Sequence, residues 1–361
     1  MTTALDFSYE SRPARVVFRP GAAESATPGE VARLGLHRVL VVCGSRGSAV
    51  ARAVADALGD SCAGLHAEAR MHVPVEVADR AVEVARAVGA DGCVAVGGGS
   101  AIGLGKAIAL RTGLPLIAVP STYSGSEMTP VWGLTEHGAK RTGRDPVVQP
   151  RTVVYDPELT LGLPVPLSVT SGVNALAHAV EALYAPDASP LVSLMAEEGV
   201  RAMAGALPQV AAAPDDLDAR GRALYGAWLC GACLGATTMG LHHKLCHVLG
   251  GTFGLPHAET HTVVLPYALA YNASAAPEAI GALSRALATD DVPRALRDLA
   301  GNLGAPRTLA ELGLKEADLA VAAAQATAAA YPNPREVTAS GVLGLLTAAY
   351  EGWEPRSDAV Q

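Results

Sequence analysis

The sequence predicts an α/β N-terminal domain with a Rossmann-like parallel sheet over residues 1–163, and an all-helical C-terminal domain over residues 164–361. Three observations support this division. The first half alternates short apolar runs with helical patterns, which is typical of a parallel sheet covered by helices. The second half consists of long Ala- and Leu-rich runs with few strand signals. The Pro-rich segment LGLPVPLS at 161–168 marks the change between the two patterns.

Four short apolar runs in the first half have the character of strands that are buried on both faces. They are RVLVVC at 38–43, GCVAVG at 92–97, LPLIAVP at 114–120 and RTVVYD at 151–156. Between the first two, PVEVADRAVEVARAVGA at 74–90 repeats Val and Ala with helical spacing. This order predicts parallel strands joined by crossover helices.

The second half predicts helices at three long runs. They are VNALAHAVEALYA at 173–185, SLMAEEGVRAMAGAL at 193–207 and LYGAWLCGACLGATTM at 224–239. The sequence shows no internal repeat that would indicate a solenoid.

Composition excludes several classes of protein. The chain has 361 residues, of which half are apolar and 17% are charged, as in soluble globular proteins. No apolar run approaches the roughly 18 residues of a membrane span, and MTTALDFSYE lacks the features of a signal peptide. A net charge of -8 argues against nucleic acid and against a membrane surface as partners. We therefore expect a cytoplasmic homodimer that acts on a small molecule.

The six cysteines lie scattered in apolar stretches, which favours buried free thiols in a reducing compartment over a disulfide framework. Cys230 and Cys233 form a CxxC inside a helical run without a second pair. We expect them to pack in the core rather than to bind zinc or carry redox chemistry.

Lysine is rare in this chain. Only four of the 27 basic residues are lysine, and the others are arginine. A lysine that persists against this bias suggests a need for a compact ammonium group. The four are Lys106, Lys140, Lys244 and Lys315, and the first three lie in motifs described below.

A glycine-rich turn follows the strand at 92–97. Gly97, Gly98 and Gly99 allow close approach of a ligand to the backbone, and Ser100 opens a helix whose first amides could bind a pyrophosphate. The next strand leads into PSTYSGSEMTP at 120–130, which adds hydroxyls at the same edge of the sheet. Candidate cofactor ligands in this second loop are Ser121, Thr122 and Ser126, and Tyr123 is a candidate catalytic residue.

Five of the ten histidines lie between residues 240 and 261, in GLHHKLCHVLGGTFGLPHAETH. His243 and His247 are four residues apart and share a helix face, as do Asn174 and His178. His257 follows a Gly-rich turn that could return it to the same point. Four such side chains could surround one ligand.

These motifs together resemble the iron-containing alcohol dehydrogenase superfamily, whose α/β domain is like that of dehydroquinate synthase. The resemblance covers nearly the whole chain through GGGS, PSTYSGSEMTP, YDPELT, NALAHAVEA and the histidine-rich stretch. It implies a metal site of one Asp and three His. The corresponding positions here are Asn174, His178, His243 and His257, so an amide replaces the only carboxylate. Loss of that charge should weaken a divalent site considerably.

Among the branches of this superfamily, the sequence is most similar to the maleylacetate reductases, through the segment AKRTGRDPVVQPRTVVYDPELT. That resemblance implies metal-independent reduction of maleylacetate to 3-oxoadipate in the degradation of aromatic compounds. Hydride addition to an enone builds negative charge on the ketone oxygen, so the site needs a stabilising cation and a proton donor. Candidates are His243, Lys244 and His247 as imidazolium or ammonium groups, with Asn174, His178, His257 and Arg144 as substrate-binding residues and Arg141 beside them.

The cofactor preference stays open. Gly44, Ser45 and Arg46 follow the first strand, where NAD-preferring relatives tend to carry an Asp. With Arg46 near a 2′-phosphate, either NADH or NADPH could bind, and Lys140 could contact the cofactor instead of the substrate. The GxGxxG of ordinary Rossmann dehydrogenases is absent, because CGSRGS has only two glycines.

Three other functions compete with this interpretation. A metal-dependent alcohol dehydrogenase would have to tolerate Asn174 as a neutral ligand. A lyase or cyclase related to dehydroquinate synthase would need a complete metal site and several lysines. A non-catalytic binding protein would not need both a dinucleotide loop and a histidine cluster.

Overall fold

The computed structural model describes residues 7, 9, 15–136 and 139–356; the side chains of Arg46 and Lys140, two expected cofactor ligands, lie outside this description. The chain divides into two compact units. One comprises Arg12–Leu163 and Asp215–Leu224, and the other mainly Pro164–Pro214 and Tyr225–Gln361. Among the described residues, the expected domain limits, 1–163 and 164–361, differ from these units by the segment Asp215–Leu224 and by residues 7 and 9, and they stay a prediction.

A parallel six-stranded sheet forms the centre of the N-terminal unit, and the strand order is β1-β8-β5-β4-β2-β3. All four expected strands are present. The strands are β1 (Arg15–Phe18), β2 (Val39–Val42), β3 (Cys62–His66), β4 (Gly92–Gly97), β5 (Leu116–Pro120) and β8 (Thr152–Tyr155). The α/β class predicted from the sequence is therefore confirmed for this unit.

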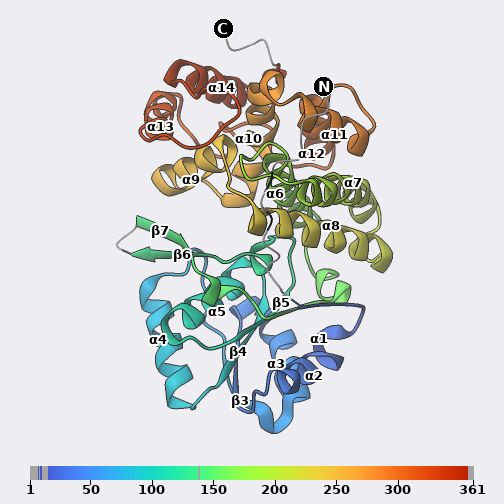
Figure 1. Ribbon diagram of the computed structural model, residues 1–361, viewed down its shortest axis with the longest axis vertical. Coiled ribbons are helices and arrows are strands. Elements are labelled where there is room, and N and C mark those ends of the chain that lie inside the picture. Colours follow the sequence, from blue (N-terminus) through green and yellow to red (C-terminus); the bar gives the residue numbers. More distant parts are fainter. Residues whose placement is uncertain (1–6, 8, 10–14, 137–138, 357–361) are drawn as a thin grey trace. The chain divides into compact units, whose positions relative to one another are not determined.

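Helices cover both faces of the sheet (Figure 1). The helices α1 (Ala22–Ser25), α2 (Thr27–Arg33) and α3 (Ser48–Leu58) pack on one face, against valines and isoleucine of the central strands. The other face carries α4 (Val75–Ala87) and α5 (Gly99–Thr112). A Cβ at Gly105 would lie only 2.9 Å from the Cβ of Ala95, so a glycine is needed for α5 to approach the sheet this closely.

The TGRD segment lies in an antiparallel hairpin, which the sequence did not predict. Its strands are β6 (Val131–Glu136) and β7 (Ala139–Arg144). The Asp145 carboxylate accepts a hydrogen bond from the amide of Val147 at 2.9 Å and begins the short 3₁₀ turn that follows.

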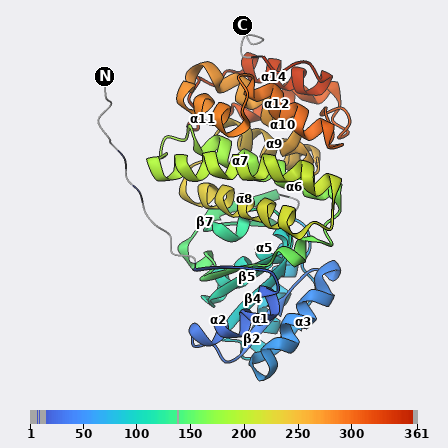
Figure 2. The same cartoon turned by 90° about the vertical axis from the view of Figure 1, so that its right-hand side faces the viewer.

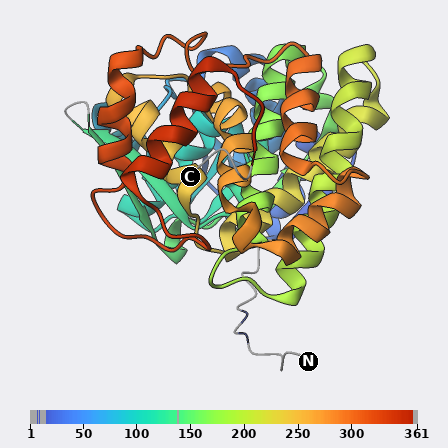
Figure 3. The same cartoon turned by 90° about the horizontal axis from the view of Figure 1, so that it is seen from above.

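The C-terminal unit is helical in its described residues, as expected. Its helices are α6 (Val165–Ala182), α7 (Pro190–Ala212), α8 (Leu217–Ala236, which begins in the other unit), α9 (Leu241–Phe253), α10 (His257–Asn272), α11 (Pro277–Leu287), α12 (Val292–Asn302), α13 (Leu319–Ala326) and α14 (Ala339–Glu351). Figure 2 shows α6 and α7 side by side, and Figure 3 shows the red helices α13 and α14 packed together.

Helix α10 is the centre of this unit. It packs against α6, α9, α12 and α14, and every residue from Thr260 to Asn272 is buried. A helix that is covered on all sides needs no amphipathic pattern, which explains why this one was not evident as a separate element.

The six cysteines are free thiols, five of them buried, as expected. Cys230 packs against α7, where a Cβ at Gly199 would lie 3.0 Å from its sulfur. Among the described helices, none has by itself the length and apolar character needed to cross a membrane; only α8 and α9 together, bent by 96°, meet those criteria, on length and composition alone.

Candidate active site

The glycine-rich turn after β4 is built to bring the backbone close to a ligand. Gly97 has φ +136°, which L-residues with a side chain rarely adopt, and α5 begins at Gly99 without a side-chain cap. Gly98 and Ser100 are half-buried and Gly99 is exposed. Amides at such a helix start form an anion site.

The two loops expected at this edge of the sheet do lie together. The amide of Ser121 donates to the carbonyl of Gly97 at 3.1 Å. A Cβ at Gly98 would lie 2.9 Å from Cγ2 of Thr122. Ser121, Thr122 and Ser126 are half-buried beside the turn. The parallel strands β4 and β5 bring the loops together because their carboxyl ends share one edge.

Replacement of Gly98 by Val should raise the cofactor KM far more than the substrate KM. The added methyls would occupy the space of a pyrophosphate and press on Thr122. Steady-state kinetics, with cofactor and substrate varied in turn, measure the two KM values. Gly29→Ala, in a helix position with open space around it, should change neither constant. Equal rises in both KM values for Gly98→Val would show that the turn is only structural.

Lys106, a residue of α5, connects this helix to the second loop by hydrogen bonds. Its ammonium donates to the carbonyls of Ser126 (2.6 Å), Thr129 (2.8 Å) and Val131 (2.7 Å), and to Oγ1 of Thr129 (2.9 Å). The side chain is fully buried, and burial lowers the pKa of Lys106 to about 7, against the opposing effect of the Glu127 carboxylate. Lys106 therefore fixes the conformation of the second loop through these hydrogen bonds.

The second loop also contains buried groups. The hydroxyl of Tyr155 donates to Oε1 of Glu127 at 2.9 Å, and burial raises the pKa of both groups. Tyr123 is fully buried, which gives no support to the direct catalytic role expected for it.

The basic residues of the hairpin differ in their surroundings. Arg141 forms an exposed ion pair with Glu136 at 2.9 Å, whereas Arg144 is exposed and close enough to lower the pKa of Lys106. After β2, Gly44 is half-buried with extended backbone, and Ser45 is exposed.

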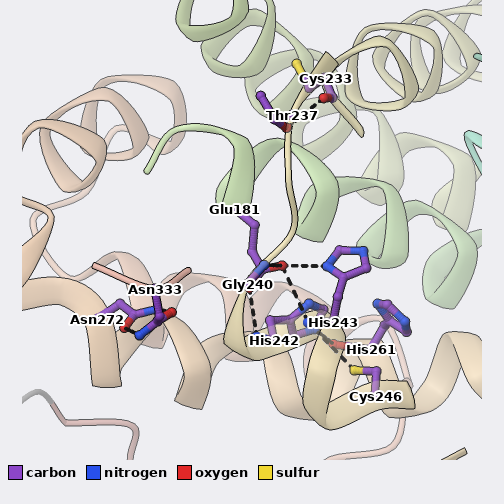
Figure 4. A network of polar contacts seen from close by, with 10 residues as sticks. All are labelled: Glu181, Cys233, Thr237, Gly240, His242, His243, Cys246, His261, Asn272 and Asn333. Carbon is purple, nitrogen blue, oxygen red and sulfur yellow. Dashed lines mark hydrogen bonds and ion pairs between the residues drawn. The ribbon is translucent and has the colours of Figure 1, made fainter. Parts of the chain in front are cut away.

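In the C-terminal unit, α6 places Asn174, His178 and Glu181 on one face, and all three are buried. Glu181 caps the N-terminus of α9. The N-cap residue of this helix, Gly240, has no side chain that could accept a hydrogen bond from its amides. The Glu181 carboxylate accepts from the amides of Gly240 at 3.0 Å and His242 at 2.7 Å (Figure 4). The start of α9 is thus anchored by a helix about 60 residues earlier in the chain.

Glu181 also orients His243. Nδ1 of His243 lies 2.6 Å from Oε2 of Glu181, so Nδ1–H donates and Nε2 carries the lone pair. Burial, with a contribution from His247, lowers the pKa of His243 to about 3. The ring is therefore neutral near pH 7. In the absence of substrate, burial therefore favours a neutral ring at His243 over the imidazolium expected from the sequence.

His242 and His261 are site residues that the sequence analysis missed. In the sequence His242 was only one of the five clustered histidines, but in the structure it is fully buried. Its Nε2–H donates to the carbonyl of His261 at 3.1 Å. His261 is also fully buried. The four-residue spacing of His257 and His261 on α10 was the signal that could have identified the latter.

The imidazoles form one contiguous cluster. Ring centroids are 5.2 Å apart for His178 and His243, 4.9 Å for His243 and His261, 4.8 Å for His242 and His261, and 4.3 Å for His257 and His261. His247 is exposed, with its ring 6.3 Å from that of His243, while His257 and Lys244 are half-buried. The cluster thus extends from the interior to the surface.

The buried imidazoles should make the metal-free protein sensitive to acid. Burial lowers the pKa of His242 to about 4 and that of His243 to about 3, whereas an unfolded histidine titrates near about 6.5. Between these values the unfolded state binds more protons, so stability is complete above about pH 6.5 and falls as the pH falls. We expect a lower urea midpoint at about pH 5 than at about pH 7.5. An unchanged midpoint would contradict this.

The residues at the family's ligand positions lack the anionic ligand of its metal site. Asn174, His178, His243 and His257 supply an amide and three imidazoles, without an anion. Glu181, a carboxylate on the same face of α6, is already held by His243 and the backbone of α9. The loss of the anionic ligand expected from the sequence is therefore not compensated by a neighbouring carboxylate within this hydrogen-bond network.

Family models and individual relatives match this chain over nearly its full length. Residues 13–157 match the family model for iron-containing alcohol dehydrogenase, and residues 168–350 match that for the C-terminal part of the Fe-containing alcohol dehydrogenase family. A maleylacetate reductase from Burkholderia cepacia is 53% identical, covering 97% of this chain and 99% of its own.

Two solved structures are also similar. A maleylacetate reductase from Agrobacterium tumefaciens superposes with a TM-score of 0.94 at 51% identity, covering 98% of this chain and all of the other. A putative alcohol dehydrogenase from Ralstonia eutropha JMP134 gives a TM-score of 0.96 at 57% identity, with the same coverage.

Proposed function

This chain belongs to the iron-containing alcohol dehydrogenase family, and we propose that it reduces maleylacetate to 3-oxoadipate with NADH or NADPH, without using a metal. It is an oxidoreductase of that family. The proposed substrate rests on the similarity to maleylacetate reductases, which extends over nearly the full length of this chain and of each relative. The cytoplasmic location and the homodimeric state expected from the sequence remain predictions.

The proposed reaction balances as NAD(P)H plus a proton plus maleylacetate giving NAD(P)⁺ plus 3-oxoadipate. The hydride adds to the alkene carbon that lies β to the ketone. The π electrons move to the ketone oxygen, and the resulting enolate takes a proton at its α carbon. Protein groups must therefore stabilise an oxyanion and deliver one proton.

The cofactor residues of this proposal are Gly97, Gly98, Gly99 and Ser100, with Ser121, Thr122 and Ser126 in the second loop. The helix start without a side-chain cap and the adjoining hydroxyls support this assignment. Gly44, Ser45, Arg46 and Lys140 are proposed for the remainder of the dinucleotide.

His243, His247 and Lys244 are the proposed acid and electrostatic residues. Glu181 would stabilise a positive charge on His243 once a dianionic substrate lies nearby, because the carboxylate is 2.6 Å from Nδ1. His247 is exposed and close to His243, which suits the exchange of protons with solvent. The proposed substrate-binding residues are Asn174, His178, His257 and Arg144.

Chelation tests the metal-independent part of the proposal. The protein should keep full maleylacetate reductase activity after treatment with EDTA, because Asn174 replaces the carboxylate that a catalytic metal would need. Asn174→Asp should gain affinity for divalent ions and lose reductase activity, since the new charge repels a dicarboxylate. Activity that vanishes on chelation and returns with iron or zinc would instead indicate a metal-dependent alcohol dehydrogenase.

A further inference from the structure

We propose that His242, His243 and His261 form a divalent-metal site that overlaps the family's ligand positions only at His243 and is inhibitory when filled. Within the described part of the chain, one ligand atom from each of these three side chains lies within 4.8 Å of the others. His243 alone is shared with the four positions discussed above. All three side chains are buried.

The tautomers of two rings leave lone pairs available to an ion. The Nδ1–H of His243 is held by Glu181, which leaves Nε2 as an acceptor. The Nε2–H of His242 is held by the carbonyl of His261, which leaves Nδ1 as an acceptor. Neither of these nitrogens, nor either ring nitrogen of His261, has a hydrogen-bond partner among the described residues.

These second contacts are the ones that metal-binding histidines use. A ligating imidazole commonly donates its other N–H to a carboxylate or a backbone carbonyl, and this contact fixes the ring and raises its basicity. Here Glu181 provides the carboxylate for His243, and the main chain of α10 provides the carbonyl for His242. Figure 4 shows the three rings gathered beside Glu181.

A set of three neutral imidazoles determines which metal ions the site prefers. Such a set suits Zn²⁺, Co²⁺, Ni²⁺ or Cu²⁺, whereas Mg²⁺ and Ca²⁺ prefer oxygen ligands. Around a tetrahedral zinc with bonds of about 2.0 Å, ligand nitrogens lie roughly 3.3 Å apart. The three ligand atoms lie within 4.8 Å of one another, so each pair must close by at most about 1.5 Å to reach that spacing.

Two further imidazoles lie between the trio and the surface. His257 is half-buried with its ring 4.3 Å from that of His261. His247 is exposed with its ring 6.3 Å from that of His243.

A bound ion would occupy Nε2 of His243, the atom that the proposed reduction needs for its proton. The inhibitory part of this inference therefore rests on the proposed function. The binding part does not.

Cobalt(II) titration of the metal-free, full-length protein tests the site by its visible spectrum. We expect one Co²⁺ per chain, with the intense ligand-field absorption of a four-coordinate site, displaced by Zn²⁺. His261→Ala should weaken binding by about 100-fold or more, since a direct ligand should cost at least as much as an outer contact. His257→Ala should change affinity less than about threefold, although it removes a family ligand position. His261→Gln serves if the alanine variant does not fold.

Absence of Co²⁺ binding at millimolar concentration would overturn the proposal. So would an equal loss in His257→Ala and His261→Ala, which would place the ion at the family's positions. Zn²⁺ at saturating concentration should abolish reductase activity in the wild type, and full activity of the zinc-loaded protein would overturn the inhibitory role. A metal-free protein without reductase activity would contradict the proposed function, while leaving the Co²⁺ result unaffected.

Discussion

Replacement of His243 by Ala is expected to lower kcat by about 100-fold or more, as for the loss of a general acid or an oxyanion partner. The ring is held by Glu181 at 2.6 Å, and its other nitrogen is the atom available to a substrate. Steady-state assays with maleylacetate at saturating NADH and NADPH measure the change. Binding of the cofactor, followed by fluorescence titration, should be unaffected.

His37→Ala, at an exposed histidine, is the matched control and should keep wild-type kcat. Glu181→Gln tests whether Glu181 positions His243 for the reaction or only stabilises the fold. It should lower kcat by about 10- to 100-fold and shift the pH profile of kcat, because the imidazolium loses its counter-charge. Wild-type kcat in His243→Ala would remove this histidine from the mechanism.

Replacement of Lys106 by Met should destabilise the N-terminal unit by about 3 to 5 kcal/mol, because four buried oxygen contacts lose their donor at once. The second loop would also lose its attachment to α5, so the cofactor KM should rise. Chemical denaturation and steady-state kinetics measure the two effects.

Lys315→Met makes the same substitution at an exposed lysine and should change stability by less than about 0.5 kcal/mol. Lys106→Arg should also be destabilising, since a planar guanidinium cannot replace a compact ammonium among these oxygens. If Lys106→Met unfolds at the wild-type denaturant concentration, the four contacts do not hold the loop.

The strands that sequence analysis found are those whose apolar character is continuous. The strands β2, β4, β5 and β8 are buried along their whole length. An apolar residue is therefore favoured at every position of these strands. The strand β3 has the burial pattern of an edge, with partly exposed residues and a glycine, and β1 is only partly buried. Their strand character depends on a partner strand, which local sequence does not encode.

The scarcity of lysine proved informative at one position. Lys106 was notable only because arginine replaces lysine almost everywhere else. The structure shows four oxygens around its ammonium. Composition could indicate that the residue mattered, but its partners come from a loop about 20 to 25 residues away.

The sequence by itself determined the α/β and helical halves, the glycine turn and the chemical identity of the candidate ligands. These depend on residue type and on spacings of a few positions. Tertiary structure alone decided that Glu181 holds His243, that His242 and His261 join it, and that burial lowers the pKa of these rings. The physical reason is that protonation depends on solvation and on charges brought together by folding, here from positions 62 residues apart.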